Sequence, residues 1–281
     1  MPEVFEVYSQ IKKLLSQSSF SESPEFDARL ILSPLCACEP RELPLKYHDS
    51  LSVSDAQSAL ATAKAYAGGE PLQYLLGKWE FMSLPFIVGK GVFIPNPDTE
   101  HLVQSAIDFA KQNPRPMRLL DLCAGSGCIG VSVAHFCENV SSTLVELHDD
   151  AFSYLTQNIA LSGNDRCTPV QGDALSFSDS DGFDIILSNP PYISIDEYSQ
   201  LPGNVTAQPK TALTDGGDGL HYYNVISRNA LSMLKEGGML AFEIGFKQYE
   251  PVSETMRNLG YKHVHDRRDY SGIRRVVIGF R

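Results

Sequence analysis

The residues of this chain best suited to chemistry are Asn189-Pro190-Pro191-Tyr192, which follow a short apolar run. Proline fixes φ and has no N–H, so carbonyl oxygens in this segment remain free to accept hydrogen bonds. The Asn189 amide oxygen and the Pro190 carbonyl can each accept one N–H of a planar NH₂ group, and Tyr192 can pack over the flat system that carries it. We therefore assign Asn189, Pro190 and Tyr192 to catalysis, and these three together with Pro191 to substrate binding.

A glycine-rich segment, residues 121–130 (DLCAGSGCIG), follows another apolar run and precedes a helical pattern. Gly125 and Gly127 let the backbone approach a ligand where a β-carbon would block it. Glu146 follows at about the 20-residue spacing at which a carboxylate binds ribose hydroxyls in dinucleotide folds. The segment predicts a site for a nucleoside, and the candidate cofactor-binding residues are Asp121, Ala124, Gly125, Ser126, Gly127, Glu146, Asp173 and Asn189.

The glycine loop alone leaves a second cofactor class open. Gly125, Gly127 and Gly130 formally fit the Gly-x-Gly-x-x-Gly spacing of nicotinamide enzymes. Asp173, at the end of a third apolar run, can accept a hydrogen bond from an adenine amino group. Together with the segment that begins at Asn189, it tilts the choice away from a nicotinamide enzyme.

Alternating elements must position these motifs. Apolar, β-prone runs alternate with amphipathic ones, which predicts a mostly parallel sheet with helices on both faces and ligands beyond the carboxyl ends of the strands. The predicted strands are 118–123, 143–147, 168–171, 183–188 and 239–244, and residues 263–267 and 275–280 are predicted to form a terminal antiparallel hairpin. The predicted helices are 98–113, 128–137, 151–161, 222–234 and 249–259, with a loop over 189–219.

The first part of the chain is expected to be a separate helical unit. Apolar residues recur every three or four positions over residues 4–15, a Ser-Pro pair opens a second helix at Pro24, and a third runs to a stop at Gly68-Gly69. We predict a helical, partner-binding domain over 1–75 and a catalytic domain over 99–281. The linker 76–98 is predicted to contain a hairpin of residues 81–88 and 91–94, separated by Gly89-Lys90.

The composition is that of a globular protein and argues against broad nucleic-acid binding. The 281 residues are 43% apolar and 20% charged, as in an ordinary globular chain. With 23 basic and 34 acidic residues the net charge is −11, which repels a phosphate backbone, so broad nucleic-acid binding is not expected. A local basic cluster is either a solvated face or a contact for RNA or a partner; it comprises Arg267, Arg268, Arg274 and Arg275.

Metal binding and membrane insertion are also not expected. The six cysteines contain no Cys-x-x-Cys pair, and the seven histidines show no ligand spacing. The N-terminus lacks the basic start and apolar core of a secretory signal, and no run approaches the roughly 20 apolar residues of a membrane span. We expect a cytoplasmic monomer with reduced thiols.

Taken together, the motifs resemble the Asn-Pro-Pro-Tyr branch of the S-adenosylmethionine-dependent methyltransferases and, within it, the release factor glutamine methyltransferases. Asn-Pro-Pro-Tyr alone is shared with adenine-N6 DNA methyltransferases, whereas IPNPDTE at 94–100 narrows the resemblance to glutamine methylation. The resemblance covers almost the whole chain and includes residues 69–77, 94–100, the glycine loop, 188–193, 209–213 and 268–272.

The resemblance implies a Rossmann-like class I methyltransferase fold, with S-adenosylmethionine as cofactor and S-adenosylhomocysteine as its product. It implies methylation of the side-chain amide of the glutamine in the Gly-Gly-Gln motif of peptide chain release factors. It also implies that the helical domain binds the release factor. The alternatives are a glutamine methyltransferase for a ribosomal protein, an adenine-N6 DNA methyltransferase and a cofactor-binding regulator without catalysis. The net charge disfavours the DNA enzyme, and the intact segment from Asn189 to Tyr192 disfavours the regulator.

Four positions depart from the usual pattern of this family. Asn96 stands where Arg is usual, Cys123 where Gly is usual, Glu146 where Asp is usual and Gln208 where Glu is common. Glu146 keeps the carboxylate on a longer side chain, so we expect the ribose contact to survive with a shifted register. Cys123 adds a side chain near the expected methionine end of the cofactor.

Overall fold

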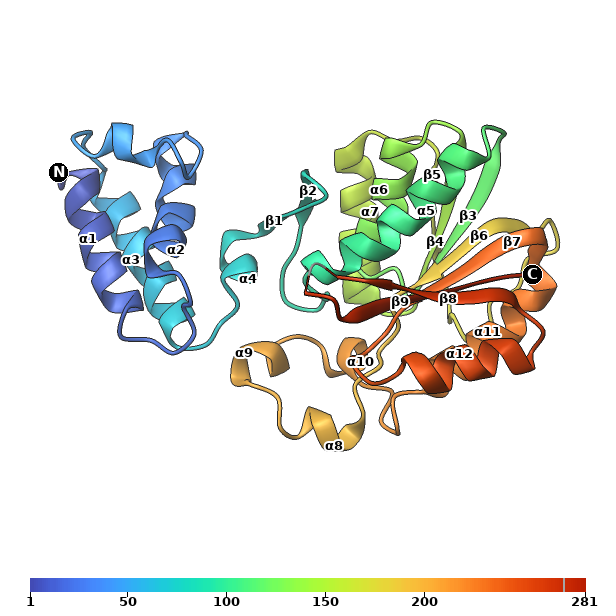
Figure 1. Cartoon of the computed structure of the whole chain (residues 1–281). Coiled ribbons are helices and arrows are strands. Elements are labelled where there is room, and N and C mark those ends of the chain that lie inside the picture. Colours follow the sequence, from blue (N-terminus) through green and yellow to red (C-terminus); the bar gives the residue numbers. More distant parts are fainter. Residues whose placement is uncertain (270) are drawn as a thin grey trace. The chain divides into compact units, whose positions relative to one another are not determined.

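The computed structural model describes residues 1–269 and 271–281 and divides into two compact units (Figure 1). One unit comprises Met1–Gly77 with Pro202–Ala207, and the other comprises Lys78–Leu201 with Gln208–Arg281. Tyr270, which belongs to the 268–272 motif, lies outside the described residues. The domain limits at residues 75 and 98 stay predictions.

The first unit is helical, as predicted. Its helices are α1 (Val4–Leu15), α2 (Pro24–Leu32), α3 (Val53–Ala67) and the short α4 (Leu72–Leu76), with 3₁₀ turns at Ser33–Cys36 and Leu43–Lys46. The apolar stripe of α1 is buried against the other two long helices, and the core includes Val7, Ile11, Leu15, Ala28, Leu32, Ala59 and Ala63. Ser52 caps α3, since its hydroxyl accepts the Asp55 N–H at 3.0 Å.

The hairpin that precedes the sheet lies earlier in the chain than predicted. Strand β1 (Lys78–Phe81) pairs antiparallel with β2 (Leu84–Ile87), so the prediction of strands at 81–88 and 91–94 around Gly89-Lys90 is wrong. Met82 and Ser83 form the turn with φ values of +52° and +60°. Turns of this kind usually use Gly, Asn or Asp, and this one has none of them.

The second unit is built on a seven-stranded sheet. Its spatial order is β5-β4-β3-β6-β7-β9-β8, and every neighbouring pair is parallel except the two pairs that involve β9. This confirms a mostly parallel sheet with a terminal antiparallel hairpin. The strands are β3 (Met117–Leu122), β4 (Val140–Glu146), β5 (Cys167–Gln171), β6 (Phe183–Ser188), β7 (Leu234–Glu243), β8 (Lys262–Arg268) and β9 (Arg274–Phe280).

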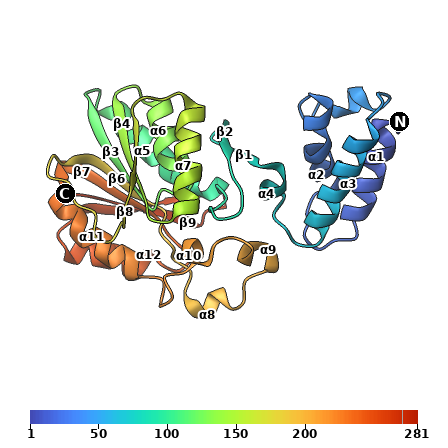
Figure 2. The same cartoon turned by 180° about the vertical axis from the view of Figure 1, so that it is seen from behind.

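Helices cover both faces of this sheet (Figure 2). Helices α5 (Glu100–Gln112), α6 (Cys128–Phe136) and α7 (Asp149–Ser162) lie on one face, and α11 (His221–Met233) and α12 (Tyr249–Asn258) on the other. Successive strand residues alternate between the two cores: Leu119 and Ile185 pack with the first set of helices, Leu120 and Ile186 with the second. The predicted loop 189–219 contains three short helices, α8 (Ile195–Tyr198), α9 (Gly203–Thr206) and α10 (Lys210–Leu213).

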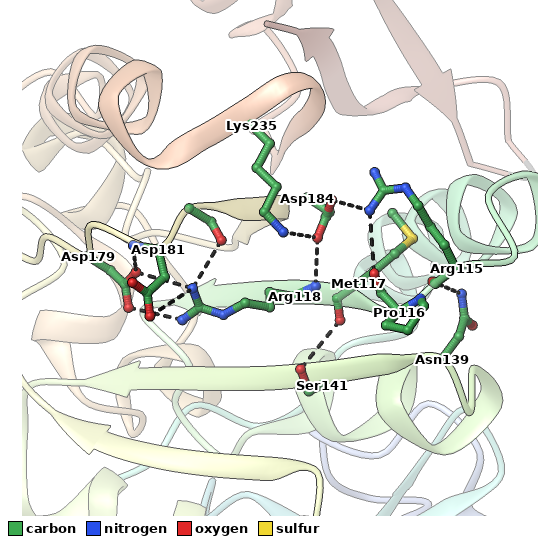
Figure 3. A network of polar contacts seen from close by, with 11 residues as sticks. Arg115, Pro116, Met117, Arg118, Asn139, Ser141, Asp179, Asp181, Asp184 and Lys235 are labelled. Atoms are coloured by element: carbon green, nitrogen blue, oxygen red, sulfur yellow. Dashed lines mark hydrogen bonds and ion pairs between the residues drawn. The ribbon is translucent and has the colours of Figure 1, made fainter.

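A cluster of ion pairs joins the strands at the amino ends of β3, β6 and β7 (Figure 3). The buried Asp184 carboxylate accepts from Arg115 at 2.7 Å, from Lys235 at 2.9 Å and from the Arg118 backbone N–H at 2.8 Å. Burial would raise the pKa of Asp184, but these donors outweigh it and hold the pKa below its ordinary value. This edge of the sheet is therefore fixed by a charge that its neighbours satisfy.

Candidate active site

The opposite edge, at the carboxyl ends of β3, β4, β5 and β6, holds all the residues that the sequence assigned to the site. These four strands are parallel neighbours, so their carboxyl ends meet at one edge. Asp121 belongs to β3, Glu146 ends β4, Asp173 follows β5 and Asn189 follows β6. The structure thus brings the predicted residues to one place, and their contacts with ligands stay predictions.

Asn189 and Pro190 present two acceptor oxygens to which no described residue donates a hydrogen bond. Pro190 is buried and Asn189 is partly exposed. The strand below them is held in place because Ser188 pairs with Phe242 of β7 and donates its hydroxyl to the Leu122 carbonyl at 2.7 Å. Two neighbouring acceptors without donors suit a planar group with two N–H bonds.

A chain of hydrogen bonds fixes the other end of the Asn189 amide. Its Nδ2 donates to Thr99 Oγ1 at 3.2 Å, and Thr99 Oγ1 donates to Glu243 Oε2 at 2.5 Å. Thr99 belongs to a 3₁₀ turn, Pro97–Thr99, and Glu243 is the last residue of β7. The Tyr192 hydroxyl donates to the second Glu243 oxygen, Oε1, at 3.1 Å.

The Glu243 carboxylate is buried, and burial dominates its titration. Glu243 is 2% exposed and Thr99 is 1% exposed. Burial raises the pKa of Glu243 to about 7, against the opposing effect of the hydrogen bonds from Thr99 and Tyr192. Burial, with the nearby Glu243 charge, also raises the pKa of the Tyr192 phenol well above its usual value, so this hydroxyl remains a donor.

In the glycine loop between β3 and α6, Gly125 and Gly127 differ in the space that is available for a β-carbon. A β-carbon on Gly127, whose φ is +81°, would lie 2.5 Å from Leu155 Cδ1, so a side chain there would strain the backbone and force the buried Leu155 side chain to shift. A β-carbon on Gly125, with φ +55°, would meet no atom within 4 Å. The loop is therefore open at Gly125, on the segment where the sequence predicts a ligand, while Ala124 and Ser126 beside it are buried.

Two carboxylates beside this loop are oriented by backbone N–H groups. Glu146 accepts from Gly125 at 2.8 Å through Oε2 and from His148 at 2.9 Å through Oε1. Asp173 accepts from the Leu175 N–H at 2.9 Å. Each ionised carboxylate oxygen can accept more than one hydrogen bond, so both groups can also accept hydroxyl or amino protons of a nucleoside.

Asp121 lies beneath the loop, and Cys123 is strained within it. Asp121 is fully buried, its Oδ2 accepts from the Gly130 N–H at 2.9 Å, and its Oδ1 has no partner in the described part of the chain. Burial raises the pKa of Asp121 to about 7, and the nearby Glu146 adds to this effect. Cys123 adopts φ +62°, which explains why glycine is usual there, and burial raises the pKa of its thiol.

Three polar residues that support the site escaped the sequence analysis. Asn158 of α7 is 1% exposed, and its Nδ2 donates to the Ser126 carbonyl at 2.9 Å and to the Ile87 carbonyl at 3.0 Å. Gln248 donates to the Tyr192 carbonyl at 2.8 Å and accepts from the Gly245 N–H at 2.9 Å. The third is Glu243, the last residue of β7. An acidic residue directly after an apolar run is the one sequence pattern that could have pointed to it.

Two of the departures from the family pattern have local structural roles. The Asn96 side chain caps the 3₁₀ turn that carries Thr99, since its Oδ1 accepts the Asp98 N–H at 3.0 Å. Gln208 Oε1 accepts the Ile94 N–H at 3.0 Å, a bond that the commoner glutamate could also form. Neither departure removes a contact on which the Asn189 segment depends.

The basic cluster of β8 and β9 is neutralised by acidic partners. Arg267 pairs with Asp108 at 2.7 Å and Arg268 with Asp266 at 3.0 Å. Arg275 bridges Asp98 at 3.1 Å and Asp269 at 3.0 Å, and Arg274 pairs with Glu250 and Asp266. These pairs favour the interpretation of the cluster as a structural face over a contact for RNA.

Neither a metal cluster nor a membrane span is found in the described chain. Within residues 1–269 and 271–281, no group of three or more His, Cys, Asp or Glu side chains could hold a metal ion. Over the same ranges, no helix has the length and apolar character needed to cross a membrane.

Comparisons with a solved structure and with a family model define the class to which the fold belongs. The chain superimposes on the catalytic domain of hMettl16, solved in complex with the MAT2A 3′UTR hairpin 6, with a TM-score of 0.58. The match covers 82% of this chain and 83% of that domain at 18% identity, so it shows a common fold alone. Residues 99–236 match the family model of the methyltransferase small domain. The fold is that of a class I methyltransferase.

Comparison of sequences defines the family. Residues 6–77 match the PrmC N-terminal domain model. The release factor glutamine methyltransferase of Vibrio cholerae is 35% identical over 94% of this chain and 92% of its own length. The protein of the same description from Fusobacterium nucleatum is 40% identical over 74% of this chain, and the match spans 59% of that protein's length. The chain belongs to the release factor glutamine methyltransferase family, as the resemblance implied.

Proposed function

We propose that this protein transfers a methyl group from S-adenosylmethionine to the side-chain amide nitrogen of the glutamine in the Gly-Gly-Gln motif of peptide chain release factors. One observation carries the proposal. Asn189 and Pro190 offer adjacent acceptors that have no donor in the described chain, and the Asn189 amide nitrogen is turned away toward Thr99. A primary amide is a planar group with two N–H bonds, which these two oxygens can accept together.

The residues of the glycine loop fit S-adenosylmethionine. Gly125 is open where a β-carbon would stand, and the oriented carboxylates of Glu146 and Asp173 can accept ribose hydroxyl and adenine amino protons. Ala124, Ser126 and Gly127 complete the loop, and Asp121 holds it from beneath through Gly130. When bound, S-adenosylmethionine supplies a methyl carbon that its sulfonium leaving group activates.

Asn189 and Pro190 can activate the substrate amide nitrogen in two ways: they fix its orientation, and they stabilise the positive charge that develops on it. The nitrogen lone pair of an amide is delocalised, so a fixed orientation contributes much of the rate; alignment supplies up to roughly 7–11 kcal/mol in favourable systems. As the N–C bond forms, positive charge develops on the nitrogen, and the two acceptors stabilise it through the N–H groups. The surplus proton leaves the nitrogen for solvent after transfer, and no strong base is required.

The helical unit is the part of the chain that we propose binds the release factor. Its region 6–77 matches a domain model of its own, separate from the one that matches the catalytic region. The functional site described above lies wholly in the second unit, which leaves the first available for recognition. We also propose that the protein is cytoplasmic and monomeric.

The substitution Asn189→Ala tests the proposed function. It removes one acceptor and leaves the glycine loop intact, so we expect the methylation rate of release factor to fall on the order of 100-fold or more. Although Asn189 is also a candidate cofactor contact, Glu146 and Asp173 keep their orientation in this variant, so S-adenosylhomocysteine binding, measured by calorimetry, is expected to stay within about twofold. Asn224→Ala, on the exposed side of α11, is the matched control and keeps full activity.

The same assay separates the alternatives. Radiolabelled methyl transfer is measured in parallel with release factor, a ribosomal protein fraction and DNA as acceptors. Label on the release factor glutamine supports the proposal, and label confined to ribosomal protein or to DNA replaces it with that alternative. Cofactor binding without transfer to any acceptor identifies a regulator that has lost catalysis. Unimpaired transfer by Asn189→Ala contradicts the assigned role of Asn189.

A further inference from the structure

We propose that Glu243, acting through Thr99, determines which end of the Asn189 side-chain amide faces the substrate. Glu243 and Thr99 are then positioning residues, since neither is assigned a contact with the reacting atoms. The inference deepens the proposed function and rests on it for its catalytic consequence. The orientation of the amide can be measured without any substrate.

The three residues come together because of the register of the sheet. Ser188 is paired with Phe242, so the next residues along the parallel strands, Asn189 and Glu243, emerge side by side at the carboxyl edge. Thr99 is inserted between their polar ends, with its oxygen 3.2 Å from Asn189 Nδ2 and 2.5 Å from Glu243 Oε2. All three residues lie within one compact unit.

Counting donors and acceptors fixes the direction of each bond. An ionised carboxylate can only accept, so it must receive the single proton of the Thr99 hydroxyl. The Thr99 oxygen then has only lone pairs to offer, and the group facing it must be a donor. Among the two ends of the Asn189 amide, only the NH₂ can donate. The amide oxygen is thereby left to face the site, where the substrate requires an acceptor.

Protonation of Glu243 would remove this constraint. A neutral carboxyl group can donate its proton to Thr99, and the Thr99 hydroxyl can then donate to the Asn189 amide oxygen. In that arrangement the amide turns over and presents its NH₂ to the site. Two NH₂ groups would then face each other, and the substrate amide would lose an acceptor.

The surroundings of Glu243 let it change its charge in the neutral pH range. Burial favours its neutral form and raises its pKa to about 7. In the described part of the chain, no lysine or arginine forms an ion pair with its carboxylate. The titratable and charged groups that face it from the elements packed around it are Asp98 of the 3₁₀ turn, Tyr192 after β6, Arg275 of β9, Tyr223 of α11 and Cys128 of α6.

The first experiment compares pH profiles of release factor methylation for the wild type, Thr99→Val, Thr99→Ser and Glu243→Gln. In the wild type, kcat is expected to rise through about pH 7, where Glu243 ionises. Thr99→Val removes the link, so kcat at pH 8 is expected to fall about 10-fold or more. The KM for release factor is expected to stay within about twofold, because the factor binds over a much larger surface.

The conservative variants distinguish positioning from general damage. Thr99→Ser keeps the hydroxyl and is expected to retain both the rate and the rise near pH 7. Glu243→Gln cannot ionise, so its profile is expected to be flat across this range. Thr156→Val, at a partly exposed position, and Glu236→Gln, at an exposed one, make the same changes outside the site and are expected to match the wild type. Thr99→Val with unchanged kcat, or Glu243→Gln with an unchanged profile, overturns the proposal.

The second experiment reads the amide itself and needs no substrate. The side-chain NH₂ resonances of Asn189, assigned by their loss in Asn189→Ala, are followed by ¹⁵N NMR from pH 5.5 to 8.5. We expect an inflection near pH 7 in the wild type that is absent in Thr99→Val and in Glu243→Gln. It should persist in Asp121→Asn, which removes the other site carboxylate that titrates near 7.

The two experiments fail independently of each other. A wild type that methylates no release factor refutes the proposed function, yet the NMR titration still decides whether Glu243 orients Asn189. A wild type that methylates release factor but shows no inflection at Asn189, or shows one that survives Glu243→Gln, refutes the positioning role alone.

Discussion

The two edges of the sheet treat buried carboxylates in opposite ways. At the amino edge, Asp184 is surrounded by two cations and a backbone N–H, which hold its pKa below the ordinary value (Figure 3). At the carboxyl edge, Asp121 and Glu243 are as deeply buried, and burial raises both pKa values to about 7. The same strands thus connect one edge where a buried carboxylate pairs with cations to another where Asp121 and Glu243 form no ion pair in the described part of the chain.

This difference indicates that the amino edge of the sheet serves stability and the carboxyl edge serves function. A satisfied carboxylate such as Asp184 joins three strands at little cost to the folded state. A carboxylate without a cation, such as Glu243, costs stability when it is ionised. It is tolerated where its acceptor capacity orients other groups, as at Thr99 and Tyr192.

Removing the satisfied carboxylate is expected to have the largest effect on folding. Asp184→Ala leaves Arg115 and Lys235 without their shared partner and the Arg118 N–H without an acceptor. We expect the free energy of unfolding to fall by about 3 kcal/mol, measured by urea denaturation. The methylation rate of the remaining folded protein at low temperature should be near that of the wild type.

The matched control for this change lies in the same network. Asp181 is exposed, and its carboxylate lies 3.9 Å from Arg118 (Figure 3). Asp181→Ala is expected to change stability by less than about 0.5 kcal/mol, as most exposed ion pairs do. Equal effects of the two substitutions would contradict the importance of burial and cation pairing at Asp184.

At the carboxyl edge, the buried Asp121 is expected to make the stability of the fold depend on pH. The folded-state pKa of Asp121, about 7, lies above its ordinary value of 3.8, so between these pH values the folded protein holds a proton that the unfolded chain has lost. The wild type therefore loses stability as pH rises through this range. Asp121→Asn lacks this loss, and its stability relative to the wild type should improve by on the order of 2 kcal/mol from pH 5 to pH 8.

Comparing differences across pH removes the constant cost of the new amide. Asp184→Asn provides the contrast, because the lowered pKa of Asp184 keeps this carboxyl ionised throughout pH 5–8. Its stability difference from the wild type should be the same at both pH values. A flat difference for Asp121→Asn as well would show that the two edges do not differ in the way proposed.

The sequence predicted helices and strands well where the apolar pattern and the flanking turn residues indicated the same boundaries. The strand 183–188 and the proline that opens α2 were found because apolar runs and turn residues coincide there, although Ser23 before that proline makes no side-chain capping hydrogen bond. The hairpin was misplaced because Met82 and Ser83 adopt left-handed backbone without a glycine. In that case the pairing of β1 with β2 decided the turn, and local preference did not.

Only the site residues that belong to continuous sequence motifs could be predicted from the sequence. The glycine loop and the Asn189 segment are contiguous, and β–α alternation brings their ends to one edge. Glu243 lies 144 residues from Thr99 in the sequence, and Asn158 lies 71 residues from Ile87. A single polar residue whose partner is so distant has no local pattern, and a pKa set by burial requires the packed structure.

Cys123 offers the finest test of strain at the carboxyl edge. Left-handed backbone costs an L-residue roughly 1–2 kcal/mol, and Cys123 has φ +62°. Cys123→Gly relieves this strain but gains entropy in the unfolded chain, so we expect stability within about 0.5 kcal/mol of the wild type. Cys123→Val, branched at its β-carbon, is expected to cost about 1 kcal/mol in urea denaturation.

The control is Cys137→Val, because Cys137 is buried, whereas Cys123 is partly buried, and has extended backbone, with φ −129° and ψ 98°. A β-branched residue suits that conformation, so this substitution should be the better tolerated of the two valines. If valine is tolerated equally at both positions, the loop is free to relax and the strain at Cys123 is not retained. If it is not, the loop that we assign to the cofactor is held in a conformation that packing around Gly127 and Asp121 maintains at the expense of its own backbone.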